Sequence, residues 1–332
     1  YYAMVGWLTR GWAPDPAVLL MRILSGLVAA ALVASAAVSL RGAGGRGFTA
    51  VGLVAGLTPM ALMLMGTVNP NGFEAAAAVG VWAALLAVAD GDGPPGTRLL
   101  VRLAVASVLL VGARPLSPGF LALILVTVAA LTLDRERARV LLADTGARVT
   151  AAVVGVATLA STAFVLVNGS LSAVITHIPE ESHGPAGRAV EAIGDTGKHL
   201  EQAVALLGWL GQAEVTLPDT VWRGWLVVLA GLLVAALVVS SWRRRVVLVA
   251  LLGAVLALPV VANVTSDDVR WQGRYVLPLL VGLPILCGWQ LDRSPRVAAR
   301  LRRLVPVAVA VLLAGAGFVA HQTLLSRSVV GW

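Results

Sequence analysis

Three short polar segments could carry chemistry in a chain that is otherwise strongly apolar. Residues 69–74 read Asn-Pro-Asn-Gly-Phe-Glu, and the carboxylate at their end could bind a metal ion, a sugar hydroxyl or a proton. Residues 113–118 contain an arginine beside two prolines, and a guanidinium binds phosphate or diphosphate through paired hydrogen bonds. Residues 267–278 combine two acids, two arginines, a glutamine and two aromatic residues. The candidate substrate-binding residues are Asn69, Asn71, Glu74, Arg114, Asp268, Gln272, Arg274 and Tyr275.

Each segment also has a plainer interpretation. Asn71 could cap a helix and leave Glu74 in the first turn, where the helix dipole favours an anion. Arg114 could extend its side chain to lipid headgroups. Trp271 and Tyr275 fit an aromatic belt at the membrane interface, although an anchor alone does not need so many polar neighbours. These alternatives stay open for the first two segments, and the third favours function.

The rest of the chain consists of apolar segments that must hold these residues in place. Hydrophobic residues make up 58% of the sequence, charged residues only 13%, and the mean hydropathy is +0.88. A soluble protein of this length needs more charge on its surface, whereas a membrane helix needs about 20 apolar residues. The sequence therefore predicts an all-α polytopic transmembrane bundle of about ten helices in a single domain, residues 1–332. The predicted spans are 17–40, 49–67, 73–89, 98–112, 117–133, 147–168, 221–241, 245–263, 273–290 and 304–324.

Arginine-rich connections follow every second predicted span. Because basic residues are retained on the cytoplasmic side, these five connections are predicted to be cytoplasmic. The net charge of +8 therefore indicates an anionic inner leaflet as the partner and no nucleic acid. The three polar segments and residues 168–220 then face outward. The five connections lie near residues 41–46, 90–98, 134–139, 243–245 and 293–303.

The long outer segment, residues 168–220, predicts an amphipathic helix from about residue 186. Glu191, Asp195 and His199 would lie opposite its apolar stripe, but their spacing matches no tight metal-ligand pattern, so a solvated surface is favoured. The helix would lie flat on the membrane or cap a wet cavity between two short spans, 98–112 and 117–133. The apolar stripe comprises Val190, Ile193, Leu200, Val204 and Leu207.

The start of the chain, Tyr1-Tyr2-Ala3, resembles the end of an outer loop because it has neither an initiator methionine nor a basic signal sequence. We therefore expect an earlier membrane helix and part of a first outer loop upstream, the alternative being a processed terminus. The single cysteine, Cys287, lies inside a predicted span and can form no intramolecular disulfide. Gly52 and Gly56 form a small-xxx-small pair that would let two helices approach closely.

Together these segments resemble the bacterial membrane family called domain of unknown function 2142. That family is similar to the GT-C superfamily of polytopic glycosyltransferases, which take a sugar from a polyprenyl-phosphate donor on the outer face of the plasma membrane. The resemblance implies a GT-C-like bundle and a catalytic acid in the first outer loop, upstream of residue 1. Glu74 is then a candidate supporting acid. The resembling segments are Tyr1-Tyr2-Ala3 with Gly6, Thr58-Pro59-Met60, and residues 69–74, 113–115 and 272–278.

Two functions of different classes are compatible with this pattern. The first is a glycosyltransferase that builds cell-envelope glycan, with a polyprenyl-phosphate-linked sugar as donor and a glycan acceptor; no cofactor is assigned, and a divalent metal stays an open alternative. The second is a transporter or flippase of lipid-linked glycan or another envelope precursor, which requires ionisable residues near mid-membrane. The sequence has few such residues, which favours the enzyme. A non-catalytic scaffold would not explain the polar outer segments.

Overall fold

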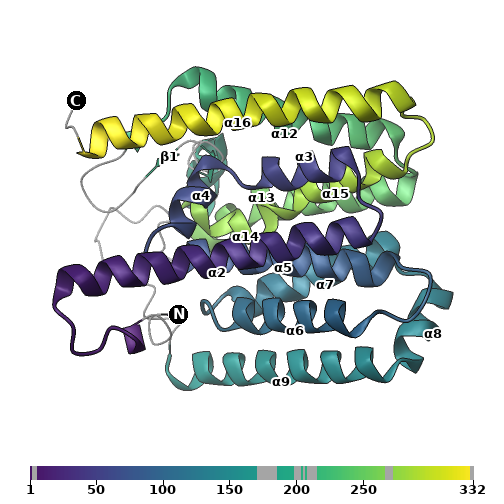
Figure 1. The fold of residues 1–332 in the computed structure, drawn as a ribbon, viewed down its shortest axis with the longest axis horizontal. Helices are drawn as coiled ribbons and strands as arrows, with labels where there is room; N and C mark the ends of the chain where they lie inside the picture. The colour runs from purple at the N-terminus through teal and green to yellow at the C-terminus, as the bar shows by residue number, and fades with distance from the viewer. Residues whose placement is uncertain are drawn as a thin grey trace.

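The computed structural model describes residues 1, 6–169, 185–197, 203–204, 206–207, 215–265 and 272–329. Its helices run side by side along one direction, which confirms the predicted all-α polytopic transmembrane bundle (Figure 1). By length and composition, seven helices of this described part could cross a membrane, or eight if one bent pair is a single span. A two-residue antiparallel ladder joins β1 (Leu206–Leu207) to β2 (Val215–Thr216).

Ten helical segments follow the ten predicted spans in order. They are α2 (Pro14–Gly42), the pair α3 (Gly47–Gly56) and α4 (Pro59–Met65), α5 (Pro70–Asp90), α6 (Thr97–Val111), α7 (Ser117–Thr132), α9 (Thr145–Val167), α12 (Asp219–Val239), α13 (Trp242–Thr265), the run η2 (Gly273–Val276), α14 (Leu277–Leu280) and α15 (Gly282–Arg293), and α16 (Ala299–Val329). Two further helices are α8 (Arg135–Ala143) and α10 (Pro185–Gly194). Both α6 and α7 are short, as predicted; a wet cavity between them stays a prediction.

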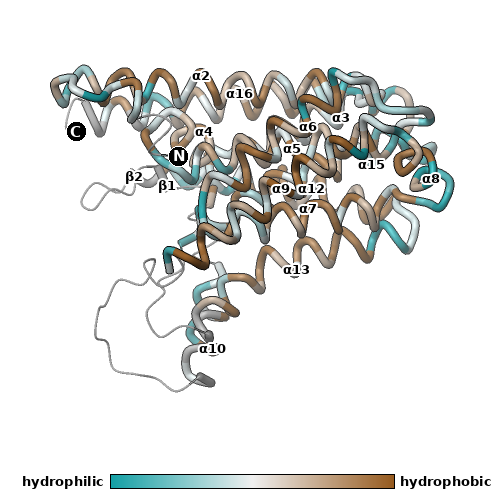
Figure 2. The backbone as a smooth tube through the Cα atoms, turned by 90° about the horizontal axis from the view of Figure 1, so that it is seen from below, coloured by the Kyte–Doolittle hydropathy of each residue, from teal (hydrophilic) through white to brown (hydrophobic). Residues whose placement is uncertain are grey.

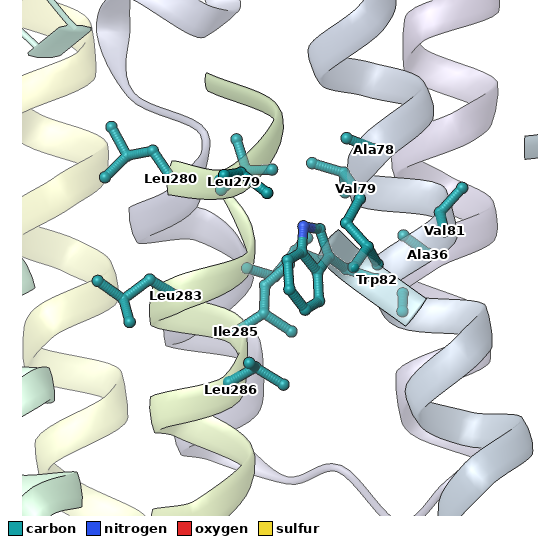
Figure 3. Close-up of a cluster of buried hydrophobic side chains, with 14 of the residues drawn as sticks. Ala36, Ala78, Val79, Val81, Trp82, Leu279, Leu280, Leu283, Ile285 and Leu286 are labelled. Carbon is teal, nitrogen blue, oxygen red and sulfur yellow. The ribbon is translucent and has the colours of Figure 1, made fainter. Parts of the chain in front are cut away.

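The core lies between α5 and the run from η2 to α15, because both are enclosed by other helices over nearly their whole length. Trp82 of α5 fills the space between them, and its indole N–H donates to the Pro278 carbonyl oxygen at 2.9 Å (Figure 3). The ring lies so close to Gly282 that a Cβ there would overlap it. Outer helices such as α9 instead expose most of their apolar residues, as lipid contact requires.

The second predicted span, 49–67, is not continuous, so that part of the prediction was wrong. α3 and α4 are bent by 68° relative to each other. Pro59 begins α4, where its missing N–H costs nothing, and the Thr58 side chain accepts a hydrogen bond from the Ala61 N–H at 3.2 Å. The same hydroxyl donates to the Ala203 carbonyl oxygen at 3.0 Å. The break therefore has a local cause, a proline with its cap, and a distant partner that covers it.

Glycines allow α3 to pack directly against α15. A Cβ at Gly52 would meet the Pro284 carbonyl, and a Cβ at Gly56 would lie 2.7 Å from the Val281 carbonyl oxygen. From the other side, a Cβ at Gly288 would overlap the Phe48 carbonyl. The small-xxx-small pair of α3 thus faces backbone atoms of α15, the close approach that such pairs permit.

The outer amphipathic helix is shorter than predicted. α10 ends at Gly194, and Leu207 of the expected stripe belongs to strand β1, so a single helix through residue 207 was wrong. Glycine is a poor helix former, and the sequence has two in four residues at this point, Gly194 and Gly197. Val190 and Ile193 are exposed on α10, which lies beside α13 (Figure 2). Leu200 of the expected stripe and His199 of the opposite face lie outside the described residues.

The arginine-rich connections come together at one end of the bundle, the end marked by α8 in Figure 2. Arg137 of α8 is buried and donates to the carbonyl oxygens of Val88 at 3.1 Å and Gly93 at 2.6 Å, where α5 ends. Arg243 donates to the carbonyl oxygens of Ala130 at 2.8 Å and Leu133 at 2.9 Å, where α7 ends. Val88 and Ala130 lie in the last turn of their helices, so these cations satisfy carbonyls that a helix leaves unpaired there.

Asp90, Asp292 and Arg293 join the remaining connections at this end. Arg293 forms an ion pair with Asp90 and donates to the Ala43 carbonyl oxygen at 2.8 Å, so the ends of α2, α5 and α15 meet. Asp292 is buried and accepts hydrogen bonds from the first residues of α3. We call this end the Arg-rich end. Its common location on one side agrees with the alternating topology predicted from the arginines.

Candidate functional site

Glu74 lies at the end of the bundle opposite the Arg-rich end, deeper than predicted. α5 begins at Pro70, and its cap is Asn69, whose side chain accepts a hydrogen bond from the Asn71 N–H at 2.9 Å. The expectation that Asn71 caps this helix was therefore wrong. Glu74 falls in the second turn and not the first, and its side chain has no solvent exposure.

Two groups from the connection between α6 and α7 contact the Glu74 carboxylate. The Ser117 hydroxyl donates to Oε1 at 2.5 Å, and Arg114 Nη1 lies 3.6 Å from Oε2. Ser117 is fully buried at the start of α7, and its oxygen also accepts a hydrogen bond from the Arg114 backbone N–H at 3.1 Å. The carboxylate thus meets a hydroxyl and a cation, the two kinds of partner that make a buried charge tolerable.

Arg114 connects Glu74 to the third polar segment. Its Nη1 donates to Asn71 Oδ1, and Asn71 in turn donates from its side chain to Asn69 Oδ1 at 2.8 Å. The guanidinium carbon lies 4.5 Å from the centroid of the Tyr275 ring, which is a cation–π contact. Five of the predicted site residues are therefore in one contiguous network: Asn69, Asn71, Glu74, Arg114 and Tyr275.

Arg274 lies at the same aromatic ring, with its guanidinium carbon 5.5 Å from the Tyr275 centroid. Gln272 precedes the short helix η2, and its carbonyl oxygen accepts a hydrogen bond from the Tyr275 N–H at 2.9 Å. The side-chain oxygen of Gln272 is buried and receives no hydrogen bond from any described residue. Asp268 lies outside the described residues.

Ser117 is a member of this network that the sequence prediction missed. It lies directly before Pro118 and three residues after Arg114, and that spacing was the available signal. Tyr1 lies near this network, because its ring packs against Phe73, the residue before Glu74, at a centroid distance of 5.4 Å; its hydroxyl is 2.9 Å from the Ser25 hydroxyl. Within the described ranges, no three His, Cys, Asp or Glu side chains group as a metal ion would require.

Comparison of the sequence with known protein families identifies the family of this chain. The family described as "Predicted membrane protein (DUF2142)" matches residues 1–283. The chain belongs to this family. The matched part of this DUF2142 protein includes every site residue named above, and the resemblance seen in the sequence motifs is confirmed. No curated protein and no solved structure matches the chain.

Proposed function

We propose that this DUF2142 protein is a GT-C-type membrane glycosyltransferase. It would transfer a sugar from a polyprenyl-phosphate donor to a glycan acceptor on the extracytoplasmic face of the bacterial plasma membrane, in cell-envelope synthesis. One observation carries this proposal. Arg114 and Arg274, which come from segments far apart in the sequence, both place their guanidinium groups on the Tyr275 ring, at the end away from the Arg-rich connections.

A pair of guanidinium groups suits the chemistry of such a transfer. When the bond between the sugar and the lipid phosphate breaks, the phosphate keeps the bonding electrons and gains negative charge. Fixed cations stabilise charge that develops in the transition state, and they do so more strongly away from bulk water. A polyprenyl chain lies in the bilayer with its phosphate at headgroup level, so donors at the end of a helical bundle are at a suitable depth.

The other groups at this end support binding of a sugar. The buried side-chain oxygen of Gln272 accepts no hydrogen bond from the described residues, and a sugar hydroxyl is a suitable donor for it. The competing transport function requires ionisable groups near mid-membrane, whereas the buried carboxylates Glu74 and Asp292 both lie within two turns of a helix end. The enzyme is therefore the better-supported proposal.

We call Arg114 and Arg274, the two arginines that would bind the donor phosphate, the phosphate clamp. Substitution of Arg274 tests it. The full-length protein, purified in a bilayer, would be assayed for sugar transfer from polyprenyl-phosphate sugars. We expect Arg274→Ala to lose about 10- to 100-fold in activity, because one charge-assisted contact is worth roughly 1.5–3 kcal/mol. Arg274→Lys should fall between wild type and alanine, because it keeps the charge but loses the planar fork.

Arg223 provides the matched control. It also stacks on an aromatic ring, with its guanidinium carbon 5.2 Å from the Trp222 centroid, and it pairs with Asp219 at 2.7 Å at the start of α12. It is exposed and has no contact with the Glu74 network among the described residues. Arg223→Ala should keep wild-type activity. Wild-type activity in Arg274→Ala, or equal losses in both variants, would show that the clamp is misassigned.

A further inference from the structure

The Glu74 carboxylate is closed off from any acceptor sugar. Its side chain has no solvent exposure, one oxygen receives the Ser117 hydroxyl at 2.5 Å, and the other faces Arg114 at 3.6 Å. A general base must come within hydrogen-bond reach of the hydroxyl that it deprotonates. Glu74 instead reaches only groups of the protein itself, so its effect on a ligand has to pass through one of them.

Arg114 is the group through which Glu74 can act. Its side chain keeps 16% solvent exposure, whereas Glu74 and Ser117 are fully buried, and it also contacts Tyr275. Its hydrogen bonds to described side chains use Nη1 alone, on the edge that faces Asn71 and Glu74. A guanidinium has five N–H donors in a rigid plane. Because its Nη1 edge and the face on Tyr275 are both held, the direction of its remaining N–H donors is also fixed.

We infer that Glu74, together with Ser117, is a positioning residue that holds the Arg114 guanidinium against Tyr275, in one orientation for the phosphate of the lipid donor. This inference rests on the proposed phosphate clamp. Ser117 contributes twice, because its hydroxyl donates to Glu74 while its oxygen accepts the Arg114 backbone N–H at 3.1 Å. Both ends of the arginine, backbone and side chain, are therefore tied to the same carboxylate.

The test measures binding of polyprenyl phosphate without a sugar to the full-length protein in phosphatidylcholine nanodiscs. Glu74→Gln keeps the size of the side chain but removes its charge, and we expect a Kd about tenfold weaker than wild type. Ser117→Ala keeps the charge of Glu74 and removes the hydroxyl that holds Glu74 and Arg114, and we expect a Kd about threefold weaker than wild type. If Glu74→Gln does not insert or fold, Ser117→Ala decides the outcome alone.

Coupling to Arg114 separates positioning from direct contact. In an Arg114→Ala background, the further change Glu74→Gln should have no additional effect on the Kd, because the group that it orients is gone. If the two losses add, Glu74 acts on the ligand directly and the inference is wrong. It is also wrong if Glu74→Gln abolishes turnover while leaving the Kd unchanged, since that is the behaviour of a catalytic acid or base.

Asp292 supplies a control for a merely structural role. It is a second buried carboxylate, at the Arg-rich end, and it accepts hydrogen bonds from three residues of the chain. Asp292→Asn should lower the melting temperature and leave the Kd unchanged.

Failure of the phosphate clamp gives a different result, because Arg114→Ala and Arg274→Ala would then both bind polyprenyl phosphate with the wild-type Kd. If Arg114→Ala binds weakly while Glu74→Gln and Ser117→Ala bind as wild type, the positioning role is wrong and the phosphate clamp stands.

Discussion

Individual residues at the Arg-rich end have structural partners that the positive-inside rule does not describe. The Asp292 carboxylate is the clearest case, because it caps α3 from a helix more than 200 positions later in the chain. Its Oδ2 accepts from the N–H groups of Arg46 and Thr49 at 2.8 Å each and from the Thr49 hydroxyl at 2.7 Å, and its Oδ1 accepts from Phe48 N–H at 3.2 Å. α3 has no cap of its own.

We expect Asp292→Asn to destabilise the protein by about 1.5–3 kcal/mol, the usual worth of hydrogen bonds to a charged group. The amide has only one oxygen, and its NH₂ would face the N–H donors at the start of α3. Unfolding in a denaturing detergent, followed by tryptophan fluorescence, measures the change. Arg300→Gln, on an exposed residue at the same end, is the control. Equal stability in both variants would show that the cap contributes little.

At the scale of elements, the contact between α3 and α15 depends on the absence of side chains. Gly52, Gly56 and Gly288 bring backbone atoms of the two helices together, and Asp292 then reaches the start of α3 from the end of α15. This contact fixes one half of the bent pair. The other half, α4, begins at the Thr58 cap, whose hydroxyl donates to the Ala203 carbonyl oxygen at 3.0 Å.

Gly288→Ala tests this contact. The added Cβ would overlap the backbone of Phe48, so the helices must separate, which we expect to cost about 1–3 kcal/mol. Gly155→Ala in α9 is the matched control, because a Cβ there would meet nothing within 4 Å. Thermal melts in detergent compare the two variants. If Gly288→Ala has the same melting temperature as wild type, α3 and α15 are less closely packed than described.

At the scale of the whole molecule, two ends with different chemistry define the protein. The arginine-rich connections meet at one end, marked by α8 in Figure 2, and the Glu74 network lies at the opposite end, where α5 begins. At the Arg-rich end, the arginines bind the protein backbone as well as being available to lipid. Arg137, Arg243 and Arg293 all donate to carbonyl oxygens. The side chains from which the topology is predicted thus also satisfy carbonyl groups where the helices end.

Cysteine accessibility in intact cells checks which end faces the cytoplasm. The native Cys287 is buried, which makes it a silent background. A membrane-impermeant reagent should not label cysteines placed at Arg135 or Arg244, and it should label one placed at the exposed Glu191 of α10. Permeabilised cells should allow labelling at Arg135, which confirms that the site is reactive. Labelling of position 244 in intact cells would invert the topology and move the Glu74 network to the cytoplasmic face.

The sequence by itself determined the class of the protein, the order of its helical segments and the grouping of its arginine-rich connections at one end. Lipid imposes these features locally, because a spanning helix must be long, apolar and internally hydrogen-bonded, and basic residues stay on one side. The polar residues of the site could be selected for the same reason, since Glu74, Arg114 and Arg274 are conspicuous in an apolar chain. Which of these residues contact one another, however, could not be read from the sequence.

Tertiary structure decided what depends on residues far apart in the sequence. No local pattern shows that Ser117 bonds Glu74, that Arg114 stacks on Tyr275, or that Asp292 caps α3. The burial of Glu74 likewise follows from the helices that enclose α5 and not from its own neighbours. The amphipathic pattern near residues 186–207 was misleading for this reason: helical periodicity describes one face of a segment, whereas β1 pairs with β2 through its backbone, which periodicity does not encode.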